Sequence, residues 1–77
     1  MSNIDIELDV RGLTCPMPLL KARQALTRMT AGQVLRVLAT DPGSVRDFQS
    51  YAELTGHSLL ESSEGEGVFI HTLKKHG

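Results

Sequence analysis

Near its start, the chain alternates between apolar and acidic side chains. The apolar positions are Ile4, Ile6, Leu8 and Val10. Because successive side chains of a strand point to opposite faces, this period of two predicts a strand with one buried face over residues 4–10. Residues 34–40 form a nearly continuous apolar run, which is typical of a strand that is covered on much of both faces.

Two stretches show helical periodicity instead. The first runs over about residues 16–29 and ends at Ala31-Gly32. The second begins at Ser44-Val45-Arg46-Asp47, which we interpret as a capping box with Asp in place of Glu, and runs to about Leu54. The expected buried positions are Leu19, Ala22, Leu26 and Met29 in the first helix, and Val45, Phe48 and Ala52 in the second.

Residues 58–62 and 68–73 predict two more strands, which a tight turn at residues 64–67 joins as a hairpin. The last strand has apolar residues on both faces, so we expect it in the centre of the sheet. The order β-α-β-α-β-β predicts an α/β (α+β) two-layer sandwich, in which a four-stranded mixed sheet carries both helices on one face. The first two strands should be parallel. We expect a single domain over residues 1–77.

Composition and charge narrow the function classes. The chain has 77 residues, 40% of them apolar, and a formal net charge of −1. Near-balanced charge argues against strong direct binding to nucleic acid or to a membrane surface. No apolar run approaches the ~20 residues that span a bilayer, and residues 1–5 lack a signal-peptide pattern. A lone thiol suits the reducing cytosol, so we expect a cytoplasmic protein. We also expect a monomer.

The candidate chemistry lies where the first helix begins, around the only cysteine. Proline fits a first helical turn and disfavours helical geometry in the residue before it. We therefore interpret Cys15 as the N-cap residue, with Pro16 at N1 and Pro18 at N3. Cysteine is a weak cap compared with Ser or Asp, so its presence there indicates function rather than stability. The positive end of the helix dipole predicts a lowered pKa for the thiol.

Four neighbours complete the candidate site. Gly12 gives the loop before the thiol its conformational freedom. Arg11 and Lys21 are candidates for positive potential near the sulfur and for contact with an acidic partner surface, although they would equally fit as ordinary solvated charges. Met17 is a candidate partner contact, with a packed side chain as the alternative.

The histidines form no recognisable pattern with Cys15. His57, His71 and His76 lack metal-ligand spacing with the cysteine, so we expect no metal and no cofactor. A catalytic pair of Cys15 with a histidine stays open as an alternative, as does the reading of Cys15 as an inert, packed residue.

The motif and its surroundings resemble a known family. Residues 9–18, Asp-Val-Arg-Gly-Leu-Thr-Cys-Pro-Met-Pro, are similar to the signature of the TusA/SirA family of small sulfur-carrier proteins, which contains a Cys-Pro-x-Pro motif. Residues 31–33, 40–42 and 56–57 resemble the same family, and the resemblance covers nearly the whole chain. It implies a sandwich like the C-terminal domain of translation initiation factor 3.

The resemblance also implies a function. Cys15 would accept sulfane sulfur as a persulfide from a cysteine desulfurase or another sulfur donor protein, and pass it to a downstream acceptor protein. Gly12, Pro16, Pro18 and Arg11 would support the thiol site. Related proteins serve tRNA thiolation, molybdenum-cofactor maturation or other sulfur trafficking, and the resemblance does not choose among these pathways.

The sequence is compatible with three functions. The first is a sulfur carrier, or sulfurtransferase, that works through Cys15; whether it counts as an enzyme is left open. The second is a regulatory or RNA-binding module without thiol chemistry, motivated by Arg23, Arg28 and Arg36. The third is a thiol redox protein, which the lack of a second cysteine disfavours.

Overall fold

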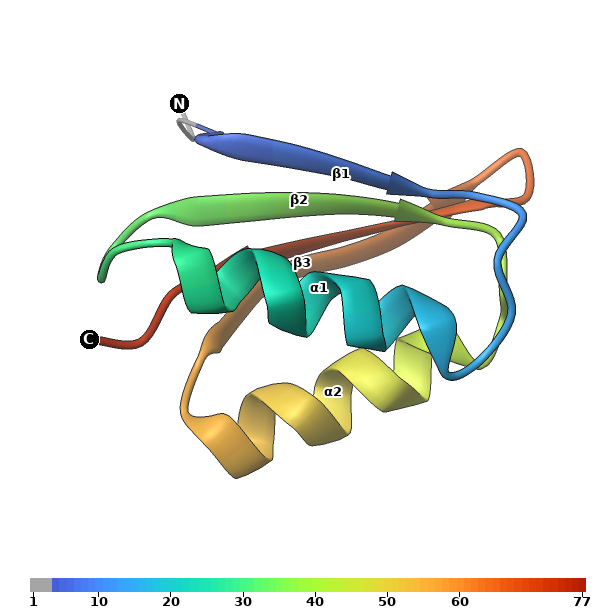
Figure 1. Ribbon diagram of the computed structural model, residues 1–77. Helices are drawn as coiled ribbons and strands as arrows, with labels where there is room; N and C mark the ends of the chain where they lie inside the picture. The colour runs from blue at the N-terminus through green and yellow to red at the C-terminus, as the bar shows by residue number, and fades with distance from the viewer. Residues whose placement is uncertain (1–3) are drawn as a thin grey trace.

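The computed structural model describes residues 4–77; residues 1–3, part of the segment compared with a signal peptide, lie outside this range. The elements follow in the order β1 (Ile6–Val10), α1 (Met17–Arg28), β2 (Val34–Ala39), α2 (Ser44–Thr55), β3 (Ser58–Gly65) and β4 (Val68–Lys74). They form two layers, with both helices on the same side of one sheet (Figure 1). The predicted α+β sandwich is confirmed.

The sheet is mixed, with the strand order β1-β2-β4-β3. β1 pairs with β2 in parallel, whereas β4 pairs antiparallel with both β2 and β3. β4 is therefore an interior strand, as its apolar residues on both faces predicted. In the parallel pair Val10 is the partner of Ala39, so β1 and β2 end at the same edge of the sheet. The loops that follow these two strands therefore begin side by side.

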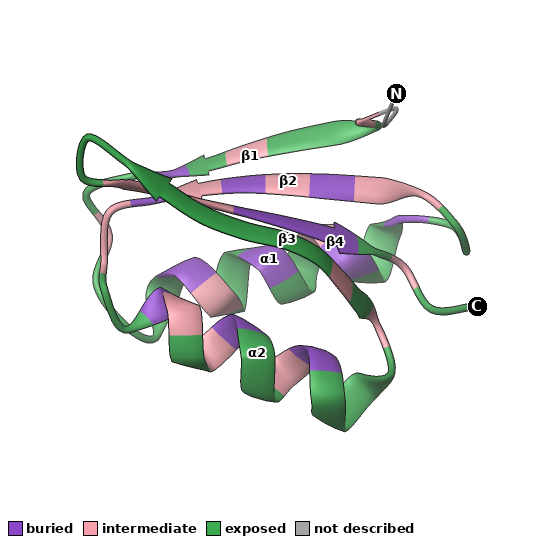
Figure 2. Cartoon of the chain, turned by 180° about the vertical axis from the view of Figure 1, so that it is seen from behind, coloured by how far each residue is buried: buried purple, intermediate pink, exposed green. Residues whose placement is uncertain are grey.

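The core fills the space between the sheet and the helices. Figure 2 shows the buried positions of α1 and α2 on the sides that face the sheet. The buried core residues are Val10, Ala22, Leu26, Met29, Leu35, Val37, Ala39, Phe48 and Leu73. The helical periodicity thus identified the buried faces correctly, although Leu19 and Val45 are only half-buried. Apolar burial of this kind is the main favourable term in folding.

The start of α1 differs from the expectation. The helix begins at Met17, and Pro16 is its N-cap residue. The N–H of Met17 donates to the carbonyl of Thr14 at 2.9 Å, which closes a turn before the helix starts, and the carbonyl of Pro16 accepts from Leu20 at 3.0 Å. The placement of Cys15 at the N-cap was therefore wrong, because the thiol precedes the cap.

The hairpin is longer than predicted. β3 continues to Gly65, and only Glu66 and Gly67 form the turn. Their φ angles are 55° and 79°, and two consecutive residues in the left-handed region are typical of a two-residue hairpin turn. The polar residues near 62–65 led to a wider turn in the prediction, because an exposed edge strand shares their composition.

Candidate functional site

Cys15 lies at the edge of the sheet where β1 and β2 both end. The loop after β1 carries the cysteine, and the loop after β2 leads directly into α2. Because the two strands are parallel neighbours, these loops and the first turn of α2 meet (Figure 1). The thiol is free and exposed to solvent. Topology thus brings together segments that lie about 30 residues apart in the sequence.

Hydrogen bonds fix the loop before Cys15 at two successive residues, Arg11 and Gly12. Asp9 accepts from the backbone N–H of Arg11 at 3.1 Å, and from its Nε and Nη2 at 2.9 Å each. Gly12 has a φ of 84°, a conformation that glycine adopts readily, and its N–H donates to Oγ1 of Thr40 at 2.8 Å. The Gly12 prediction agrees with this geometry.

The charge of Arg11 is directed to Asp9 rather than to the sulfur. The two side chains form an ion pair at 2.9 Å. The Arg11 guanidinium, through its hydrogen bonds, lowers the pKa of the Asp9 carboxyl from 3.8 to about 2. The pair fixes the loop, and its own charges largely cancel. Within the described residues, the Arg11 side chain thus contacts Asp9 and forms no hydrogen bond with Cys15.

Two carboxylates contact Cys15. Its backbone N–H donates to Oδ2 of Asp41, in the loop before α2, at 3.0 Å. Its thiol donates to Oδ2 of Asp47, in the first turn of α2, with 3.1 Å between sulfur and oxygen. The immediate partners of the cysteine are thus acidic.

The capping box predicted at residues 44–47 does not form. α2 has Gly43 as its N-cap residue and no side-chain cap hydrogen bond. Ser44 is buried and its Oγ lies 2.9 Å from Nε2 of His71, while Asp47 bonds the Cys15 thiol. Both side chains that should cap the helix are therefore used in tertiary contacts, which the local motif could not reveal.

The pKa of the Cys15 thiol is raised, not lowered as predicted. The hydrogen bond to Asp47 is the main cause, followed by partial desolvation and by the charges of Asp47 and Asp41. A negative charge close to a thiol disfavours the thiolate. The helix dipole does not compensate, because α1 starts two residues later and the prolines at 16 and 18 have no N–H to direct at the sulfur.

The remaining predicted residues lie along the start of α1. Pro18 is buried, whereas Pro16 and Lys21 are exposed. Met17 keeps 37% of its surface exposed, so it is available to a partner as the sequence suggested. α1 contains basic residues but no acidic one. An exposed helix face with apolar and basic groups therefore begins next to the thiol.

The sequence pattern did not reveal the two aspartates of the site. Asp41 lay within residues 40–42, which we recognised as a family landmark but to which we gave no role. Asp47 was assigned to a capping box, which does not form. A signal was nevertheless present, because the loop after a second parallel strand is expected beside the loop after the first.

The histidines have other partners than the thiol. Nδ1 of His57 accepts from the backbone N–H of His76 at 2.8 Å. His71 is buried, stacks on Phe48 and bonds two serines, and burial lowers its pKa. The hydrogen-bond partner of the Cys15 thiol is Asp47, so the alternative of a Cys–His pair was wrong. Within residues 4–77, no cluster of His, Cys, Asp and Glu could hold a metal ion.

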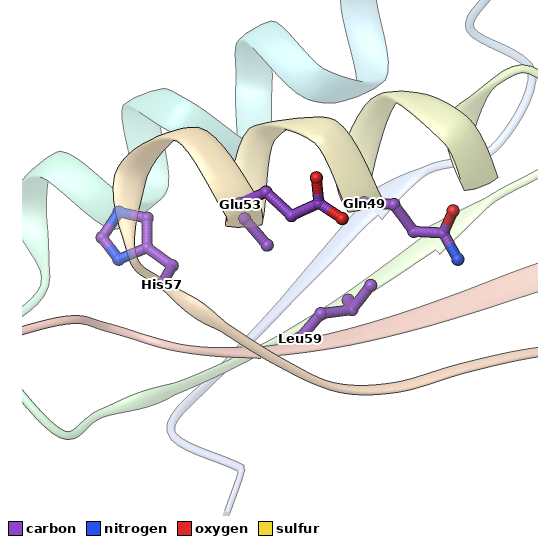
Figure 3. Close-up of a pocket in the computed structure, with 5 residues that line it drawn as sticks. Gln49, Glu53, His57 and Leu59 are labelled. Carbon is purple, nitrogen blue, oxygen red and sulfur yellow. The ribbon is translucent and has the colours of Figure 1, made fainter.

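Two open concavities lie along α2. One, of about 390 Å³, is lined by Gln49, Ala52, Glu53, His57 and Leu59 (Figure 3). The other, of about 600 Å³, is lined by Pro42, Gly43, Val45, Arg46, Asp47 and Gln49. Cys15 lines neither, although Asp47 joins the second concavity to the thiol. The sulfur thus stands on the surface rather than in a pocket that would enclose a small substrate.

Known proteins resemble this chain over most of its length. The chain is 52% identical over 75 residues to the sulfur carrier protein TusA of Allochromatium vinosum, covering 97% of this chain and 99% of that protein. A putative sulfur carrier protein of Neisseria meningitidis is 55% identical over 62 residues, which is 80% of this chain and 84% of that protein. The crystal structure of a SirA-like protein from Desulfitobacterium hafniense superposes with a TM-score of 0.82 at 32% identity, covering 94% of this chain and 99% of that one.

None of the helices among the described residues is long and apolar enough to cross a bilayer.

The model of the family described as sulfurtransferase TusA matches residues 6–75. This match spans both loops that form the thiol site, together with every strand and helix of the sandwich. The chain therefore belongs to the TusA family.

Proposed function

We propose that this protein, a sulfur carrier by its family, accepts sulfane sulfur as a persulfide on Cys15 and passes it on. The observation that carries the proposal is the position of the only cysteine: an exposed thiol on a loop that hydrogen bonds fix at the rim of the sheet. An exposed thiol of this kind is accessible to a sulfur atom held by another protein.

The chemistry balances without a cofactor. The Cys15 thiolate attacks the outer sulfur of a persulfide on the donor, a new S–S bond forms at Cys15, and the S–S bond within the donor breaks. The donor cysteine leaves as a thiolate and takes up the proton that Cys15 lost. An acceptor thiolate then attacks the outer sulfur on Cys15 in the same way. No net oxidation occurs, because one sulfur atom moves between equivalent thiols.

Sulfur donor and acceptor proteins are the partners that such a carrier needs. We assign the donor role to a cysteine desulfurase, and the acceptor role to a protein in tRNA thiolation, molybdenum-cofactor maturation or a related pathway in the cytoplasm. Met17 and Lys21, exposed on the N-terminal half of α1, are the proposed partner contacts. Gly12, Arg11, Pro16 and Pro18 support the loop.

Sulfur loading tests the proposal directly. The purified protein is incubated with a cysteine desulfurase and free cysteine, and its intact mass is measured before and after reduction. We expect a gain of one sulfur atom that maps to Cys15 and is reversed by reductant. Cys15→Ser is the control, since the side chain is exposed and its replacement should leave the fold intact. No gain with desulfurases or with inorganic polysulfide would contradict the proposal.

A further inference from the structure

The thiol and the carboxylate of Asp47 are in direct contact. Sγ of Cys15 lies 3.1 Å from Oδ2 of Asp47, although the two residues belong to different elements and are separated by 32 positions. Only a protonated thiol has a hydrogen to donate to an ionised carboxylate. This contact therefore exists in the thiol form, and loss of the proton would replace it with repulsion between two anions.

The charged groups around this contact do not offset the carboxylates. Asp41 adds a second negative charge at the backbone N–H of Cys15. Arg11, the nearest basic residue in the sequence, donates two hydrogen bonds from its guanidinium to Asp9. Four basic residues lie on the two helices, Lys21, Arg23 and Arg28 on α1 and Arg46 on α2, and none of them forms an ion pair or a hydrogen bond with Cys15 or Asp47 within residues 4–77.

Sulfur transfer needs the opposite protonation state, because the thiolate is the nucleophile. The surroundings of Cys15 in the free protein thus disfavour its reactive thiolate form. This is consistent with the raised pKa of the Cys15 thiol. A positive charge close to the two aspartates would favour the thiolate of Cys15 instead. The structure has an open concavity beside Asp47, lined also by Gly43 and Arg46, through which such a group can approach.

The geometry points to Asp47 as a residue that holds Cys15 as an unreactive thiol in the free carrier, until a basic group of a partner protein pairs with Asp47 and Asp41 and frees the thiolate. The identity of the partner as a sulfur donor or acceptor rests on the proposed function. The control of the thiol by Asp47 is independent of the proposed function. The partner is defined chemically: it carries a Lys or Arg side chain close to its own reactive sulfur.

The first test is the rate of alkylation of Cys15 by iodoacetamide as a function of pH. Asp47→Asn keeps an oxygen that can accept from the thiol but removes the charge. Each unit by which the thiol pKa falls gives about tenfold more thiolate, while the thiolate becomes about threefold less nucleophilic. We therefore expect a net gain of about threefold per unit at neutral pH, with the midpoint of the profile shifted to lower pH.

The matched control is Glu53→Gln. Glu53 lies on the same helix and carries the same charge, but it lines the other concavity (Figure 3), whose lining includes neither Cys15 nor Asp47. Its removal changes the net charge equally and should leave the alkylation profile in place. An Asp47→Asn profile that coincides with those of the natural protein and of Glu53→Gln would overturn the inference.

The second test concerns the partner's charge. Two symmetric disulfides are compared as electrophiles: cystamine, which carries ammonium groups, and dithiodiglycolate, which carries carboxylates. In each case the Cys15 thiolate forms a mixed disulfide and releases one half of the reagent as a thiolate. The rates are divided by those of free cysteine with the same reagents, because the two leaving thiols differ in pKa. We expect the natural protein to show an additional preference for cystamine at low salt, and this preference to fall in Asp47→Asn but not in Glu53→Gln.

Salt gives a test that needs no variant. At 1 M ionic strength the Debye length falls to about 3 Å, so the preference for cystamine in the natural protein should shrink. A preference for cystamine at low salt no greater than that of free cysteine would overturn the inference even if Asp47→Asn failed to fold. Loading of the same samples by inorganic polysulfide separates the two proposals, because failure to load contradicts the persulfide carrier while the alkylation profiles still report on Asp47.

Discussion

Nε2 of His71 on β4 lies 2.9 Å from Oγ of Ser44, the first residue of α2, and both side chains are buried. The other ring nitrogen lies 2.8 Å from Oγ of Ser62 on β3. The ring also stacks on Phe48 of α2, with centroids 4.6 Å apart. One imidazole thus joins the first turn of α2, which carries Asp47, to two strands of the sheet.

Replacing His71 with Ala should destabilise the protein strongly. The change leaves the buried Ser44 hydroxyl without its partner, opens a cavity against Phe48 and removes the ring stacking. Together these losses amount to about 3 kcal/mol in the free energy of unfolding, which urea denaturation measures. His76→Ala, at an exposed position, is the control and should change stability by less than about 0.5 kcal/mol. A His71→Ala protein as stable as this control would refute the structural role.

Stability should fall as the pH drops through the range in which histidine titrates. In the folded protein, burial lowers the pKa of His71 below its ordinary value of 6.5. His71 therefore binds a proton more readily in the unfolded chain. The stabilisation is complete above about pH 6.5 and is lost as the pH falls towards the folded pKa. His57, whose pKa burial also lowers, acts in the same direction.

Urea midpoints at about pH 7.5 and about pH 5.5 measure this dependence. His71→Gln removes the titrating group but keeps an amide that can bond to both serines. Its midpoint should change less between the two pH values than that of the natural protein. Identical pH dependence in the two proteins would show that His71 does not contribute.

Gly12→Ala should reduce stability by about 1–2 kcal/mol, because φ at this position is 84° and a side chain disfavours the left-handed region. A Cβ at Gly12 would contact nothing within 4 Å, so the cost arises from the backbone alone. Gly65→Ala is the matched control: its Cβ would also be free of contacts, and its φ is not positive. Thermal denaturation of both variants separates backbone conformation from crowding.

The Asp9 carboxyl should titrate at about 2, as the hydrogen bonds from Arg11 dictate. Arg11→Ala should return its pKa towards 3.8, which carboxyl carbon shifts in NMR can follow. Since the pair is exposed, the same substitution should change global stability only slightly. An Asp9 titration that is unaffected by Arg11→Ala would mean that the ion pair does not form in solution.

The local pattern of apolar and polar residues was sufficient to predict much of the fold. The alternation at residues 4–10 and the apolar run at residues 34–40 predicted two strands, and the helical spacing of Ala22 and Leu26 identified the buried face of α1. These predictions succeed because the side chains along a strand or helix repeat with a fixed period, and burial selects one face of it. The ends of the elements were less accurate, because Pro16 and the polar residues of β3 are compatible with more than one local structure.

The sequence by itself determined the sandwich, the interior position of β4 and the single thiol on the loop after the first strand. Only the tertiary structure decided what surrounds that thiol. Asp41 and Asp47 reach Cys15 because β1 and β2 are parallel and end at one edge, and the carboxylates reverse the pKa shift that the helix start alone suggested. Local periodicity acts over a few residues, whereas the charge around a side chain is set by whatever lies within a few ångströms in space.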